Sequence, residues 1–173
     1  MLHATQAHHI IHWAYLGTVL NKWVDALMVS PIDLSYTAGL FDGEGCISFA
    51  RRSRQTGGYR YSLSVSVEMS DEESIDFLHA IFGGNKMFYD RYGKKRLYRW
   101  SKASLQDVRD FLVLIEPYVK YKRPQVMAAI GYCDYMILGH VFTNAGYPDD
   151  VVAVQEEIYA DLRAMKAEAG GMR

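Results

Sequence analysis

The fold of this chain is decided by the stretch Tyr36-Thr37-Ala38-Gly39-Leu40-Phe41-Asp42-Gly43-Glu44-Gly45. The small residues Ala38 and Gly39 lie on its apolar part, and small residues let two helix backbones approach closely. The stretch ends with a carboxylate, Glu44, between two glycines, which permit a tight exit from a helix and so fix its direction. A rigid acidic group at a close helix–helix contact suits a divalent metal such as Mg²⁺, which takes oxygen ligands. The alternative is an ordinary helix followed by a glycine-rich turn.

Length and composition indicate one folded domain with a core of its own. The chain has 173 residues, of which 50% are hydrophobic, and this is about the size of one domain. No apolar run reaches the length of a membrane span, and the first residues lack the pattern of a signal peptide. Cys46 and Cys133 are far apart in sequence and fit reduced thiols. We expect a protein that is not secreted and has no membrane partner, located in the cytoplasm or an organellar matrix.

Charge is distributed unevenly along the chain, although the net charge is only −1. Residues 50–102 carry eleven Lys and Arg residues against six acids, a net charge of +5. Residues 124–173 carry three basic residues against seven acids, a net charge of −4. A basic segment beside an acidic tail is typical of phosphate binding and predicts a nucleic acid as partner. A solvated surface of mixed charge is the alternative.

The spacing of apolar residues predicts an α+β fold. The predicted helices cover residues 33–43, 71–82, 104–115, 124–137 and 149–165, and the predicted strands cover 46–52, 61–69, 86–91 and 96–101. Residues 1–30 also show helical spacing. We therefore expect a helical extension over 1–30, a core of order α-β-β-α-β-β-α over 31–130, and C-terminal helices over 131–173 that pack on this core.

In motif, element order and charge, the chain resembles the LAGLIDADG homing endonucleases over residues 33–130. The matching motif residues are Ala38, Gly39, Leu40, Asp42 and Gly43–Gly45. The resemblance implies the αββαββα fold with a four-stranded antiparallel sheet that binds double-stranded DNA. It also implies an intron-encoded, metal-dependent endonuclease that hydrolyses both strands of a long pseudo-palindromic target and leaves 3′ overhangs. A maturase-like RNA-binding splicing cofactor and a DNA-binding regulator that has lost cleavage are the alternatives.

The resemblance also implies where metal and partner bind. Glu44 and the backbone carbonyl of Gly43 are the expected ligands of Mg²⁺, for which Mn²⁺ or Ca²⁺ can substitute in binding. One motif per chain implies a homodimer that brings two copies of Glu44 together about a two-fold axis. The expected dimer contacts are Ala38, Gly39 and Asp42, and hydrogen bonding at the helix end suits Asp42 better than metal ligation.

Two further catalytic positions are less clearly marked. The family has a lysine that reaches into the site, and here Lys122 and Lys120 lie on the same side of an extended segment. We expect Lys122 to be catalytic and Lys120 to contact phosphate, although the pattern leaves their order open. The family often has a polar residue near the end of the second strand, where it orders water. Met69 falls there and cannot do so, so either Glu68 or Ser70 takes this role or the water network differs, and we favour Glu68.

The strand pattern predicts which side chains meet DNA. One face of the sheet is buried by residues such as Ile47, Phe49 and Val65, so their neighbours in sequence face outward. On that face Arg can bind guanine bidentately and Ser can hydrogen-bond in several ways, while turn lysines meet phosphates. The expected DNA-binding residues are Ser48, Arg52, Arg54, Arg60, Ser62, Ser64, Ser66, Tyr89, Arg91, Lys94, Lys95, Arg99 and Lys120.

Overall fold

The computed structural model describes residues 29–55, 57–90, 92–139 and 147–171. Its elements are α2 (Pro31–Glu44), β1 (Gly45–Ser53), β2 (Tyr59–Met69), α3 (Glu72–Phe82), β3 (Asn85–Tyr89), β4 (Leu97–Lys102), α4 (Leu105–Ile115), α5 (Arg123–Gly139) and α6 (Asp149–Gly171). This order confirms the predicted α+β fold and its αββαββα core. The predicted extension over 1–30 lies outside the described residues, apart from its last two.

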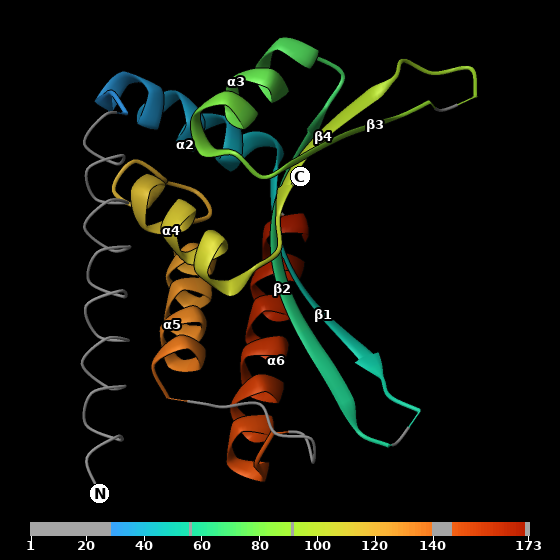
Figure 1. Ribbon diagram of the computed structural model, residues 1–173, viewed down its shortest axis with the longest axis vertical. Helices are drawn as coiled ribbons and strands as arrows, with labels where there is room; N and C mark the ends of the chain where they lie inside the picture. Colours follow the sequence, from blue (N-terminus) through green and yellow to red (C-terminus); the bar gives the residue numbers. More distant parts are fainter. Residues whose placement is uncertain (1–28, 56, 91, 140–146, 172–173) are drawn as a thin grey trace, which may run out of the picture.

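The strands form a four-stranded antiparallel sheet of order β1-β2-β4-β3. The first part of β2 pairs with β1, and its last part, residues 65–69, pairs with β4. The sheet therefore consists of two ribbons that join at its centre and diverge from there (Figure 1). We call residues 45–69 the β1–β2 ribbon and residues 85–102 the β3–β4 ribbon.

One face of the sheet is covered by helices, and the other is open. The predicted inward residues Ile47, Phe49, Leu63, Val65 and Val67 are all buried, as is Trp100 of β4. Helix side chains complete this core, and the rings of Trp100 and Phe111 lie 4.8 Å apart. Figure 1 shows the described helices gathered on one side, with the two ribbons reaching away from them. The alternation of side chains along each strand thus leaves the polar face uncovered.

Local sequence explains why α2 runs straight into β1. The helix begins at Ser30, whose Oγ accepts a hydrogen bond from the Asp33 backbone N–H (3.1 Å), and Pro31 occupies its first turn. It ends at Gly45, where a Cβ atom would overlap the ring and carbonyl of Phe41. Glycine is therefore required at Gly45, and residue 44 stands at the junction between helix and sheet.

The C-terminal helices belong to the same core as the sheet. The expected boundary between residues 130 and 131 falls inside α5, and Ala129 and Tyr132 on either side of it are both buried in the common core. Among the described residues, no helix is both long and apolar enough to cross a membrane.

Candidate active site at the end of the motif helix

Gly43 and Glu44 are the last two residues of α2, and both are exposed. The carboxylate of Glu44 and the carbonyl of Gly43 are hard oxygen donors of the kind that Mg²⁺ prefers. Within the described residues, no group of three or more His, Cys, Asp or Glu side chains could hold a metal ion. Glu44 and the Gly43 carbonyl by themselves could offer such an ion two oxygen atoms.

Asp42 uses both of its carboxylate oxygens within its own chain. Its Oδ2 accepts hydrogen bonds from the backbone N–H groups of Lys120 (2.7 Å) and Tyr121 (3.2 Å). Its Oδ1 accepts one from the backbone N–H of Lys122 (2.9 Å). Hydrogen bonds to an ionised carboxylate are among the stronger ones in proteins. Asp42 thus holds the segment between α4 and α5 against the end of α2.

The structure distinguishes the two lysines that the sequence pattern left open. Lys122 is half-buried, and its Nζ donates hydrogen bonds to the carbonyl oxygens of Phe41 (3.0 Å) and Asp42. A cation at the carbonyl end of a helix is stabilised by the helix dipole. Lys120 is exposed. The Lys122 ammonium group therefore lies at the end of the helix that bears Glu44.

The structure also distinguishes the candidates at the end of β2. Glu68 lies on the open face, opposite Arg99 of β4. Met69 lies on the covered face, opposite Tyr98, and packs against the core. Ser70 is exposed just beyond the strand. Of these residues, Glu68 is the polar side chain that the sheet itself presents on the same face as the predicted DNA contacts.

Of the expected dimer contacts, the structure gives Ala38 a different environment from Gly39. Ala38 is fully buried in the core of its own chain, so we assign its methyl group to that core. Gly39 and Gly43 are exposed, and a Cβ atom on either would meet nothing within 4 Å. Together with Ile32 and Tyr36, they form an exposed stripe of small and apolar residues along α2.

The predicted open face of the β1–β2 ribbon has the register expected from its sequence. Across the two strands Ser48 lies opposite Ser64, Ala50 opposite Ser62, and Arg52 opposite Arg60. Ser66 shares this face but is only 6% exposed, and its Oγ accepts a hydrogen bond from Nη2 of Arg99 (3.3 Å). Ser66 therefore supports Arg99 and has little surface to offer a ligand.

The β3–β4 ribbon follows the same alternation. Tyr89 lies opposite Leu97, and Met87 lies opposite Arg99, all on the open face. The turn residues Lys94 and Lys95 are exposed. The expected contact at residue 91 lies outside the described residues.

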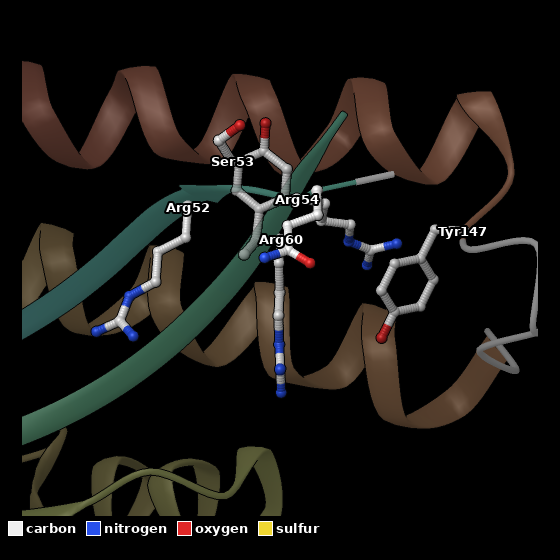
Figure 2. Close-up of a pocket in the computed structure, with 7 residues that line it drawn as sticks. Arg52, Ser53, Arg54, Arg60 and Tyr147 are labelled. Carbon is white, nitrogen blue, oxygen red and sulfur yellow. The ribbon is translucent and has the colours of Figure 1, made fainter. Parts of the chain in front are cut away.

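A hollow of about 680 Å³ lies at the far end of the β1–β2 ribbon. It is lined by Arg52, Ser53, Arg54, Gln55, Arg60, Tyr61 and Tyr147. Figure 2 shows the guanidinium group of Arg54 extending towards Tyr147, which precedes α6. The three arginines were expected from the strand pattern. Tyr147 was not, because it lies far along the chain and no motif marks it.

Solved structures share the fold of this chain, although no family model matches the sequence and no curated protein is significantly similar to it. The homing endonuclease I-TnaI is 16% identical over 81% of this chain and 97% of its own, with a TM-score of 0.59. This chain has the homing-endonuclease fold. I-CvuI in complex with its target is 17% identical over 84% of this chain and 83% of its own, with a TM-score of 0.58. The archaeal intron-encoded enzyme I-Vdi141I, complexed with DNA, is 14% identical over 75% of this chain and 83% of its own, also with a TM-score of 0.58.

This similarity confirms the fold predicted from the decapeptide and the order of elements. Two regions of this chain carry the polar residues described above. They are the end of α2 and the open face of the sheet. The first region gathers Glu44, Asp42 and Lys122. The second carries the arginine and serine side chains of β1 and β2.

Proposed function

We propose that this chain is a site-specific DNA endonuclease that hydrolyses both strands of a double-stranded target with a divalent metal ion. One observation carries the proposal: the amine of Lys122 is fastened to the end of the helix that bears the exposed Glu44. A second region, the arginine-bearing open face of the sheet, begins one residue beyond this helix end. The fold shared with I-CvuI and I-Vdi141I, both solved with DNA, supports the same function.

The chemistry follows from the charge that develops on a phosphodiester during hydrolysis. When bound by Glu44 and the Gly43 carbonyl, Mg²⁺ supplies a Lewis acid beside the scissile phosphate. The ammonium of Lys122 stabilises negative charge at the same place, since preorganised cations lower the energy of such transition states. Asp42 acts on Lys122 by holding its backbone, and Glu68 orders water from the sheet. Mn²⁺ and Ca²⁺ substitute for Mg²⁺ in binding.

A double-strand cut needs two such sites, and one chain provides one. The exposed stripe on α2, with Gly39 and Gly43 in its C-terminal half, lets the same helix of a second copy approach closely. A two-fold axis there brings two Glu44 carboxylates together and makes the preferred target pseudo-palindromic. The sheets of the two chains then extend along the DNA in opposite directions, and cleavage across the minor groove leaves 3′ overhangs.

The test substrate is a DNA duplex in which the two sequences that flank the coding gene are joined without the intron. Cleavage of this duplex tests the proposal. Glu44→Gln keeps the size of the side chain and removes its charge, so cleavage with Mg²⁺ should fall about 100-fold or more while DNA binding is retained. Glu73→Gln, an exposed acid of α3, is the matched control and should cut like the wild type. Equal cleavage by Glu44→Gln would refute the metal assignment. A wild type that binds DNA and never cuts it would be a regulator, and one that binds only the intron RNA would be a maturase.

Variants of Lys120 and Lys122, assayed on the same DNA, test the proposed geometry of the site. Lys122→Ala should slow the chemical step at saturating DNA more than it weakens binding. Lys120→Ala should do the reverse, because the exposed Lys120 side chain is placed to meet phosphate. The measurement is single-turnover cleavage beside equilibrium binding in Ca²⁺. A pure loss of binding in Lys122→Ala would move Lys122 to the phosphate contacts.

Sedimentation tests the assembly. The wild type should sediment at about twice the monomer mass of 19.7 kDa. Gly39→Leu adds a bulky side chain at the proposed contact and should abolish dimerisation together with cleavage. A monomeric protein that still cuts both strands would rule out the shared site.

A further inference from the structure

The two ribbons present different chemistry on the same open face. The β1–β2 ribbon presents mainly serine and arginine side chains there, with Ala50 as a small apolar residue among them. On the β3–β4 ribbon, Met87 is 51% exposed, and Leu97 lies half-buried opposite Tyr89. An exposed methionine diagonal to a leucine near the turn end of the ribbon is a small apolar patch on this face.

This apolar patch is not an uncovered part of the core. The core of this ribbon lies on its other face, where Trp100 is fully buried. There Lys86 forms ion pairs with Glu72 (3.0 Å) and Asp76 of α3. Helix α3 therefore covers the opposite side around Lys86 and Trp100, although Phe88 on that side is 58% exposed, and Met87 and Leu97 point away from the helix.

The surroundings of the patch favour DNA as its occupant. The turn at the end of the ribbon carries exposed Lys94 and Lys95, and Arg99 lies opposite Met87. Cationic side chains around an apolar patch fit a DNA groove, because phosphates form the sides of the groove. In the major groove the C5-methyl of thymine is the apolar group that a base pair displays, and apolar side chains contact it. Met87 and Leu97 have no strong hydrogen-bonding group with which to read any other base edge.

We infer that Met87 and Leu97 recognise thymine methyl groups, so that the part of each half-site facing the β3–β4 ribbon is rich in A·T pairs. This inference rests on the proposed function. Residues two apart on a strand are separated by about 7 Å, which equals two base-pair steps at about 3.4 Å each. Met87 and Leu97 lie on strand positions offset by this distance, so the recognised thymines lie two base pairs apart. The β1–β2 ribbon reads its part of the half-site through hydrogen bonds.

Replacing thymine by uracil removes only the methyl group and tests the inference directly. A target is first selected from a randomised duplex library with the full chain in Ca²⁺, and binding is then measured with thymine or uracil at each position. Burying one methyl is worth about 0.8 kcal/mol, so each uracil facing Met87 or Leu97 should weaken binding by about 4-fold. Uracil at positions facing the serine and arginine side chains of the β1–β2 ribbon should leave the affinity unchanged.

Variants assign the effect to the side chains. Met87→Ala should abolish the difference between thymine and uracil at one symmetric pair of positions, and Met87→Leu should retain it. Met127→Ala is the matched control, because Met127 is similarly exposed (53%) on α5 and should keep the full difference. A target bound equally well with uracil throughout, or a thymine preference unchanged in Met87→Ala, would overturn the inference and leave the proposed function standing. Failure to bind any duplex DNA would refute both.

Discussion

Each ribbon of the sheet has an ion pair to a helix on its covered face, but the two ribbons expose different side chains on the open face. On the covered face, Arg51 of the β1–β2 ribbon pairs with Glu156 of α6 (3.0 Å). Lys86 of the β3–β4 ribbon pairs with Glu72 of α3 at the same distance (3.0 Å). Each ribbon thus has one cation tied to a helix behind it. The open faces differ in their side chains, with serine and arginine on the β1–β2 ribbon and Met87 and Leu97 on the β3–β4 ribbon.

The two attachments also differ in chemistry. The guanidinium of Arg51 lies over the rings of Tyr59 (4.5 Å) and Tyr159 (4.9 Å), and Glu156 also accepts a hydrogen bond from the Tyr61 hydroxyl. Arginine stacks on aromatic rings, whereas the compact ammonium of lysine acts as a point charge. The β1–β2 ribbon is therefore positioned by aromatic packing as well as by charge. On the β3–β4 ribbon, Lys86 lies over the ring of Tyr98 at the longer distance of 5.9 Å, and salt screens its ion pairs with α3.

The largest expected effect comes from the strand where the two ribbons meet. Trp100 of β4 is fully buried, and its Nε1 donates a hydrogen bond to the Gly83 carbonyl (2.6 Å). Trp100→Ala should lower the free energy of unfolding by about 3–5 kcal/mol, measured by urea denaturation. Tyr92→Ala, fully exposed in the β3–β4 turn, should change it by less than about 0.5 kcal/mol. A similar result for both variants would mean that the ribbons are stable without their common junction.

The next effect compares the two faces of the β1–β2 ribbon. Arg52→Ala or Arg60→Ala should cost about 1–3 kcal/mol of binding and relax base preference at one symmetric pair of positions, if that residue reads guanine. Arg51→Ala should lower the melting temperature and leave base preference unchanged, because Arg51 faces α6. The measurement is a binding profile against single-base substitutions of the target. If Arg51→Ala alone shifted the preference, the open face would not be the one that meets DNA.

The smallest effect concerns pH and the attachment of the β1–β2 ribbon. Burial, and then the carboxylate of Glu156, raise the pKa of Tyr61 to about 12 from its usual value of 10.0. The fold therefore favours the neutral phenol, and this stabilisation is complete below pH 10 and is lost as the pH rises towards 12. Between pH 8 and pH 11 the wild type should lose about 1 kcal/mol more stability than Tyr61→Phe.

Comparison of wild type and variants assigns this pH dependence to Tyr61. Burial also raises the pKa values of Tyr132 and Cys133 to about 12, but both groups are present in wild type and variant, so their contributions cancel. Tyr59→Phe, on the same ribbon but 47% exposed, should keep the pH dependence of the wild type. Identical curves for Tyr61→Phe and wild type would show that the Tyr61–Glu156 bond does not hold the ribbon on α6.

The sequence by itself determined the fold and the faces of its sheet. Helical and strand spacing are local properties, since side chains repeat every 3.6 residues in a helix and every second residue in a strand. The alternation from Cys46 to Arg52 was therefore enough to place Arg52 on the open face and Arg51 on the covered one. The glycines around Glu44 likewise marked the helix end, because the required close approach at Gly45 leaves no room for a Cβ atom.

Only the tertiary structure decided which residues meet across long distances in sequence. Lys120 and Lys122 have the same local sequence pattern. They differ in their hydrogen bonds to the end of α2, some 80 residues away: Lys120 donates from its backbone N–H to Asp42, whereas Lys122 also donates from its side-chain Nζ to the Phe41 carbonyl. The burial of Ala38 and the pairing of Arg51 with Glu156 depend in the same way on packing between distant segments. Such contacts are set by how helices pack on the sheet, and no periodicity within one segment records that packing.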